Sequence, residues 1–102
     1  IVHVAGQGGE DRDGTLAPDF DGQVRQAFAN LAAALSAAGA EPRHVAKITT
    51  FIVDHDQSKL GPLVRAVRDL FGTVLPAQTL VPVPRLALDG MLFEVEAVAV
   101  LD

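Results

Sequence analysis

Two carboxylates open the last apolar run of the chain. Glu94 and Glu96 precede a stretch of Ala, Val and Leu that ends at residue 101. Side chains two residues apart in a strand point to the same face, so Glu96 would place a like charge beside Glu94. Burial and a like charge raise the pKa of a carboxyl group, which suits it to general acid or base chemistry. The residues leave open a simpler interpretation, in which both carboxylates lie at a solvated rim.

Gln78 is the polar residue of the preceding strand-like run, and it shares a face with Leu80. Its amide offers one neutral donor group and one acceptor, which would suit an amide or carbonyl of a ligand. Backbone groups could equally satisfy the amide. Arg85 follows Gln78 by seven residues, an odd number, so in a regular strand it faces the opposite side. We expect it at the strand end, near acids or a neighbouring subunit.

Other groups of residues do not predict a phosphate-binding loop or a metal site. The segment Gly6-Gln7-Gly8-Gly9 lacks the Gly-Lys-Ser/Thr ending of a phosphate loop. His44 and His55 flank one predicted strand, and an extended segment of that length holds them too far apart to share a metal within one subunit. With no cysteine, no metal site is expected.

The expected elements alternate between strands and helices. Strands are predicted at 1–6 and 43–53 and twice within 76–101, and helices at 19–38 and from a start between 58 and 62 up to 72. Asp19 can cap the start of the first helix, and Gly39 can end it. The last two strands are joined around Asp89-Gly90, which predicts an antiparallel pair.

This order predicts an α+β domain with a mixed sheet and two helices packed on one face. Pro82 and Pro84 remove donors along one edge, so that edge is expected to be unpaired. The final strand is apolar almost throughout and is expected to be covered on both faces beyond its start. The helix-free face is expected to be largely apolar, which predicts self-association.

Composition limits the function classes. The 102 residues predict a single domain at 1–102, with 49% hydrophobic residues but only 5% aromatic ones. The net charge is −5 and the cations are scattered, which argues against nucleic-acid binding. No apolar run is long enough for a membrane span, and the absence of cysteine fits the cytoplasm. Because Ile1 begins directly as a strand without Met, the natural N-terminus is expected to be missing.

Six segments in order resemble the Rid (YjgF-like) family over essentially the whole chain. They are 4–7 (VAGQ), 23–31 (QVRQAFANL), 38–40 (AGA), 45–54 (VAKITTFIVD), 76–77 (PA) and 94–100 (EVEAVAV). The resemblance implies a chorismate-mutase-like fold and a homotrimer with clefts between neighbouring subunits. It also implies hydrolysis of reactive enamines and imines to ammonia and 2-keto acids, with no metal or organic cofactor.

The resemblance places Glu94 at the family's site glutamate and the Gly6-Gln7 segment near the cleft. One departure is central: the deaminases follow Pro-Ala with an Arg that holds the substrate carboxylate, and this chain has Gln78. The change replaces a charged, bidentate guanidinium by a neutral amide. Leu80 stands where many deaminases have Cys, and Ala5 where Ser is common.

The sequence therefore predicts a Rid-like small-molecule hydrolase acting on an imine, an enamine or a related C–N bond, with weak or altered activity. Glu94 would orient water or shuttle a proton, while Gly6, Gln7 and Gln78 would hold the polar end of the substrate. The alternative is a non-catalytic small-molecule binding or regulatory protein that uses the same cleft. RNA cleavage has been claimed for some relatives, but the acidic net charge argues against it here.

Overall fold

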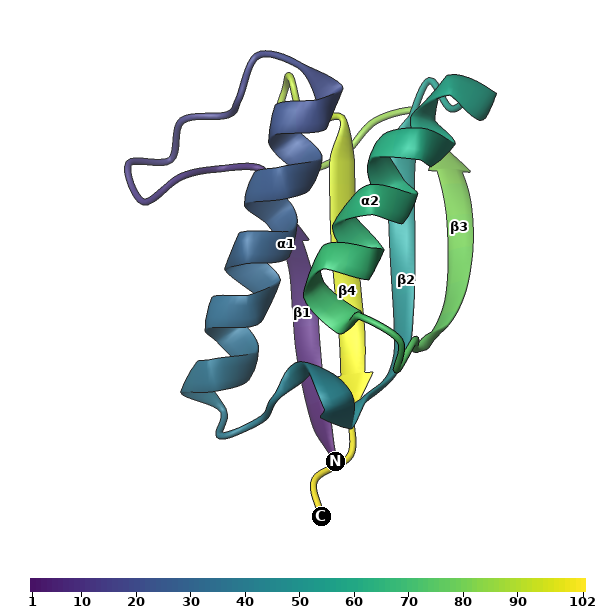
Figure 1. Cartoon of the computed structure of the whole chain (residues 1–102). Helices are drawn as coiled ribbons and strands as arrows, with labels where there is room; N and C mark the ends of the chain where they lie inside the picture. The colour runs from purple at the N-terminus through teal and green to yellow at the C-terminus, as the bar shows by residue number, and fades with distance from the viewer.

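A four-stranded sheet carries two helices on one of its faces (Figure 1), in a computed structural model that describes residues 1–102. The elements are β1 (Val2–Gly8), α1 (Phe20–Ala37), η1 (Pro42–His44), β2 (Val45–Val53), η2 (Gln57–Lys59), α2 (Leu60–Phe71), β3 (Ala77–Val83) and β4 (Phe93–Ala99). The predicted α+β fold, with both helices on one face, is confirmed. Neither helix is long and apolar enough to cross a bilayer.

The strand order is β1-β4-β2-β3, with β4 antiparallel to both of its neighbours and β2 parallel to β3. The expectation that the last two strands pair with each other is wrong, because β2 lies between them. The connection at 84–92 is long enough to pass the end of β2, where the Val53 N–H donates to the Leu92 carbonyl. β3 is an edge strand, as Pro82 and Pro84 predict.

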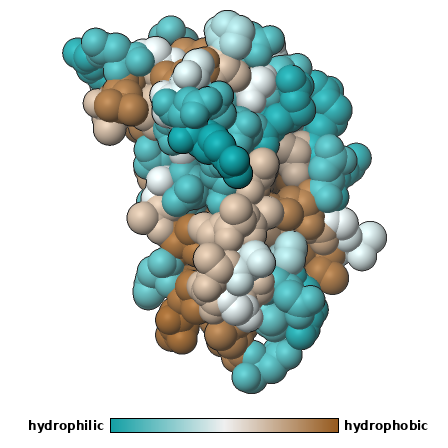
Figure 2. All heavy atoms as spheres, turned by 90° about the vertical axis from the view of Figure 1, so that its left-hand side faces the viewer, coloured by the Kyte–Doolittle hydropathy of each residue, from teal (hydrophilic) through white to brown (hydrophobic).

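The first helix begins and ends where the sequence predicts. The Asp19 side chain accepts a hydrogen bond of 2.9 Å from the Gly22 N–H, and Gly39 follows the helix with a φ of +77°. The outward side of α1 is rich in exposed alanines, Ala29 and Ala33 among them. In the view onto the α1 side, weakly apolar residues cover the lower part and hydrophilic residues gather at the top (Figure 2).

The core lies between the helices and the sheet. Phe93, at the start of β4, is fully buried, and its ring centroid lies 5.8 Å from that of Phe28 and 6.0 Å from that of Phe20. Ile48 and Ile52 of β2 are also fully buried in this layer. Each buried aliphatic or aromatic side chain contributes about 1.5–3 kcal/mol, so this layer fixes the start of β4.

The helix-free face has no cover within the chain. Along β4, buried residues alternate with partly exposed ones, so only one face of the strand is covered and the expected cover on both faces is not provided. The face is also more polar than predicted. It carries half-buried Phe51 and Val98, but also Lys47, Glu94 and Glu96. The first residues of an otherwise apolar strand thus present charge on the open side.

Candidate functional site

Glu94 lies half-buried on the helix-free face, one residue after the start of β4. Its Cα is paired with Phe51 on β2 and with Gly8 on β1. The register of β1 shifts between Val4 and Gln7, a bulge that leaves Gly6 without a partner on β4. A Cβ atom on Gly6 would collide with the Glu94 carboxylate, so the missing side chain at residue 6 makes room for this group.

The surroundings of Glu94 favour its neutral form. Burial is the main cause that raises the pKa of Glu94, followed by repulsion from Glu10 and then from Glu96. Glu94 forms no ion pair with any cation of the chain. A carboxyl group with a raised pKa and no counter-ion can exchange a proton with a bound molecule more readily than a salt-bridged one.

Glu10, which no pattern in the sequence singles out, lies close enough to this carboxylate to repel its charge. The Asn30 side chain on α1 donates hydrogen bonds to the Gly8 carbonyl (3.0 Å) and to the Glu10 carbonyl (2.8 Å). These bonds fix the segment that follows β1. The signal in the sequence is an amide at residue 30 on a helix whose inward positions are mostly apolar.

A second amide on α1 fixes the start of β4. Gln23 is only 2% exposed, and its Nε2 donates to the carbonyls of Ala17 (3.0 Å) and Gly90 (2.9 Å). Its Oε1 accepts a hydrogen bond of 2.8 Å from the Leu92 N–H. Gln23 and Asn30 are seven residues apart, about two helical turns, so one side of α1 holds both backbone segments that flank Glu94.

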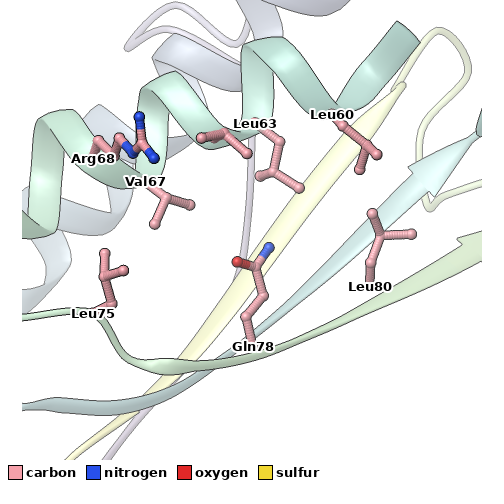
Figure 3. A pocket seen from close by; sticks show the side chains of 8 residues that line it. Leu60, Leu63, Val67, Arg68, Leu75, Gln78 and Leu80 are labelled. Carbon is pink, nitrogen blue, oxygen red and sulfur yellow. The ribbon is translucent and has the colours of Figure 1, made fainter. Parts of the chain in front are cut away.

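Gln78 lies on the opposite face of the sheet. Its Cα partner is Ile48, which is fully buried under the helices, so Gln78 points toward α2. Figure 3 shows its amide inside a groove between α2 and β3. The groove has a volume of about 380 Å³ and is lined by Leu60, Leu63, Val64, Val67, Arg68, Leu75, Gln78 and Leu80. The only hydrogen bond of the amide within the chain is a long one of 3.4 Å to Thr50 Oγ1.

The structure therefore brings together only part of the predicted site. Gly6 contacts Glu94 on the helix-free face, whereas Gln78 lies on the helix side of the sheet. The bulge pairs Gln7 with Val95, a core residue, so Gln7 also turns toward the helix side, and its amide donates to the Ala5 carbonyl at 3.0 Å. One chain cannot present Glu94 and Gln78 to the same small molecule.

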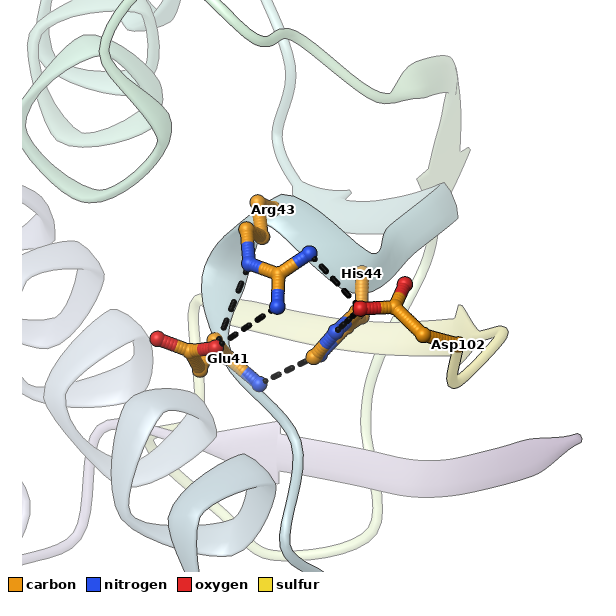
Figure 4. Close-up of polar contacts among 4 residues, drawn as sticks. All are labelled: Glu41, Arg43, His44 and Asp102. Carbon is orange, nitrogen blue, oxygen red and sulfur yellow. Dashed lines mark hydrogen bonds and ion pairs between the residues drawn. The ribbon is translucent and has the colours of Figure 1, made fainter.

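A separate polar cluster joins η1 to the C-terminal residue (Figure 4). The Glu41 N–H donates to His44 Nδ1 at 2.9 Å, and His44 Nε2 lies 3.5 Å from Asp102. Arg43 contacts both Glu41 and Asp102 at 3.1 Å, and its hydrogen bond to Asp102 is the main cause that lowers the pKa of that carboxyl group. No three His, Asp or Glu side chains of the chain converge as metal ligands. We therefore assign this cluster a structural role.

Comparison with known proteins identifies the family. The sequence profile described as Endoribonuclease L-PSP matches residues 1–101. The chain belongs to this family. The Rid chain is 36% identical to the RutC family protein YjgH of Escherichia coli over 100 residues, which cover 97% of this chain and 74% of that protein. The expected Rid (YjgF-like) membership is confirmed.

Two further relatives are informative. The 2-iminobutanoate/2-iminopropanoate deaminase of Salmonella typhimurium is 32% identical over 92 residues, which cover 89% of this Rid chain and 71% of the enzyme. The structure of YyfB, a Rid family protein of unknown function from Yersinia pestis, superposes with a TM-score of 0.91 at 33% identity. That superposition covers 98% of this chain and 77% of YyfB, which confirms the YjgF-like fold.

Proposed function

We propose that this Rid protein is a cofactor-independent hydrolase of an imine, an enamine or a related C–N bond. The observation that carries the proposal is the Glu94 carboxyl group, which is half-buried, lacks a counter-ion and has a raised pKa. A similar protein bears the name of an imine deaminase, 2-iminobutanoate/2-iminopropanoate deaminase. Cytoplasmic location is part of the proposal.

The proposed active site lies between subunits of a homotrimer. Because Glu94 and Gln78 lie on opposite faces of the sheet, a site that uses both needs two chains. The helix-free face of one subunit would supply Glu94 and Gly6, and a neighbour would supply the groove that holds Gln78. Gln7 is paired with Val95 and its amide donates to the Ala5 carbonyl, so its role would be to support the bulge beside Glu94.

The reaction adds water to a polarised C=N bond. The Glu94 carboxylate takes a proton from water as the oxygen bonds to carbon, and the protonated carboxyl group returns this proton to the nitrogen, which has taken up the π electrons. In the carbinolamine that results, the carboxylate takes the hydroxyl proton as the carbonyl forms and passes it to the nitrogen, so the C–N bond breaks and ammonia leaves. A carboxyl group with a raised pKa suits both steps because it can accept the proton and return it.

Ammonia release from a freshly generated 2-imino acid tests this proposal. We expect turnover by the natural protein and a loss of about 10²- to 10⁴-fold in Glu94→Gln. Glu96→Gln, on the same face but exposed, is the matched control and should lose far less. No ammonia release by the natural protein, with release gained in Gln78→Arg, would rule out deaminase activity for this chain.

A non-catalytic ligand-binding protein is the second candidate. The observation that favours it is the apolar groove, whose only uncharged polar side chain is the amide of Gln78. Binding without any ammonia release would support it. RNA cleavage is disfavoured because Arg43, Lys59, Arg65 and Arg85 are already paired with carboxylates and the net charge is −5.

A further inference from the structure

Gly6 and Gly8 of β1 leave space for two carboxylates on the helix-free face. A Cβ atom on Gly6 would collide with the Glu94 carboxylate, and a Cβ atom on Gly8 would collide with Oε1 of Glu10. Neither glycine has a positive φ, so the backbone conformation does not itself require glycine at these two positions. What the glycines supply is the space in which the two carboxylates lie.

The strand register makes Glu10 a cross-strand neighbour of Glu94. The Cα atoms of Gly8 and Glu94 are partners in the antiparallel pair of β1 and β4, so a side chain at residue 8 would share the face of Glu94. The Cβ atoms of such partners lie about 4.5–5.5 Å apart. Since Oε1 of Glu10 lies against the Cβ position of Gly8, the Glu10 carboxylate occupies the space opposite Glu94.

Several contacts hold Glu10 in this place. The Asn30 side chain donates to its carbonyl at 2.8 Å, and Glu10 forms an isolated antiparallel bridge with Leu16. The terminal methyl group of Met91, a residue only 6% exposed, also lies against the Cβ position of Gly8. Glu10 is half-buried and forms no ion pair, so its negative charge is not neutralised within the chain.

We propose that Glu10 is a positioning residue of the Glu94 site and that its charge controls when Glu94 takes up a proton. Two neighbouring carboxylates repel each other, and protonation of one of them removes the repulsion. The proton that Glu94 takes from water in the proposed reaction is therefore bound more readily while Glu10 is ionised. Repulsion from Glu10 is also the second cause, after burial, that raises the pKa of Glu94.

This inference deepens the proposed function and rests on it in one respect, namely that proton transfer by Glu94 drives turnover. Glu10 has no step of its own in the reaction and acts only through Glu94. Its distance in sequence from Glu94 is large, and the bulge in β1 together with the Asn30 side chain brings the two acids to one face.

The other charged groups of the helix-free face are less suited to this role. They are His3 on β1, Lys47 on β2 and Glu96 on β4. The histidine and the lysine are both paired with Val98, about 13 Å beyond Glu94 along β4. The lysine ammonium also donates to Thr79 Oγ1 at 2.6 Å, on the side of β3. Glu96 is exposed and repels Glu94 less than Glu10 does.

Carbon-13 NMR of the glutamate carboxyl groups tests the inference without turnover. The signal lost in Glu94→Gln identifies the Glu94 resonance, which is then followed between pH 3 and pH 9. We expect the midpoint of its titration to move to lower pH in Glu10→Gln and further in Glu10→Lys, because an opposite charge favours the ionised form. A role of Glu10 in packing alone would not produce this order.

Asp13→Asn is the matched control. It removes one negative charge from the exposed segment that follows Glu10, and Asp13 is not among the groups that raise the pKa of Glu94. The Glu94 midpoint should therefore stay where it is in the natural protein. Circular dichroism verifies that each variant is folded.

The pH dependence of kcat/KM for ammonia release is the second measurement. Its acid limb reports the pKa of the base in the free enzyme. We expect this limb to move to lower pH in Glu10→Gln, in step with the NMR midpoint, and to stay unchanged in Asp13→Asn.

The outcomes separate this inference from the proposed function. An unchanged Glu94 midpoint in Glu10→Gln and Glu10→Lys would overturn the role of Glu10 even if ammonia is released. A midpoint that shifts in the expected order, without ammonia release by the natural protein, would support control of Glu94 by Glu10 and overturn only the hydrolase function. A shifted midpoint with an unchanged rate profile would overturn the part of Glu10 in the reaction.

Discussion

At the scale of single residues, the environment of Glu94 lowers the free energy of unfolding when this carboxyl group is ionised. Burial and the neighbouring carboxylates Glu10 and Glu96 raise its pKa above the ordinary value of 4.5. In the unfolded chain the carboxyl group would return to its ordinary pKa. The folded state therefore holds this proton more tightly than the unfolded state, and ionisation of Glu94 destabilises the fold.

The raised pKa of Glu94 determines how the stability of the fold depends on pH. Below pH 4.5 Glu94 is protonated in both the folded and the unfolded chain, and the stability that its protonated form contributes to the fold is fully present. As the pH rises through the raised pKa of folded Glu94, that contribution is lost. We expect Glu94→Gln to have a larger free energy of unfolding than the natural protein at pH 7, and this gain to shrink below pH 4.5.

Urea denaturation between pH 3 and pH 8 measures this effect. The matched control is Glu96→Gln, which removes an exposed carboxylate from the same face and should give a smaller gain because solvent screens it. A Glu94→Gln variant that is less stable than the natural protein at pH 7 would show that the carboxylate is stabilised by a contact that this structure lacks.

At the scale of elements, α1 does more than cover the sheet. Through Gln23 it binds the turn before β4, and through Asn30 it binds the segment after β1. Both strands that flank Glu94 and Gly6 are thus tied to one rigid helix. A site on strands held in this way needs no adjustment of loops to keep the carboxylate in place.

Replacing Gln23 tests this role of α1. Gln23→Leu would leave two part-buried carbonyls and one part-buried N–H without their partner, and we expect a loss of about 3 kcal/mol in the free energy of unfolding. Gln26→Leu, which removes one hydrogen bond to Asn30, should cost less than about 1 kcal/mol. Urea denaturation at pH 7 compares the two, and similar losses would argue against a special role for Gln23.

The position of β3 in the sheet is only partly encoded in its own residues. The turn at Gly90, whose φ is +88°, was predictable, and so was the unpaired edge at Pro82 and Pro84. That β2 lies between β3 and β4 was not. Strand order depends on which strands bury the most surface, and the apolar strands β2 and β4 take the two central positions.

At the scale of the whole molecule, the uncovered sheet face is the main surface that no element of the chain packs against. It combines half-buried apolar residues such as Phe51 and Val98 with the carboxylates of Glu94 and Glu96. A trimer would cover the apolar residues and would give Glu94 a more enclosed environment. The separation of Glu94 from Gln78 within one chain gives such an assembly a functional reason.

We expect light scattering to give three times the chain mass of 10.7 kDa at micromolar concentration. Phe51→Asp places a charge on the helix-free face beside Glu94. It should yield monomers, because burying an unpaired charge in a subunit interface carries a large desolvation penalty. Ala33→Asp, on the exposed side of α1, is the matched control and should remain trimeric. A natural protein that is monomeric would contradict both the trimer and the proposed shared site.

The sequence by itself determined the helices, the fold class and the family, because helix caps, apolar periodicity and the ordered segments are local properties of the chain. It also determined that Glu94 opens an apolar strand. Only the tertiary structure decided which groups meet. Glu10 comes near Glu94 through a bulge and a helix amide far away in sequence. Gln78 lies on the helix side of the sheet because the pairing of β3 with β2, and not the residues of β3 themselves, decides which face Gln78 occupies.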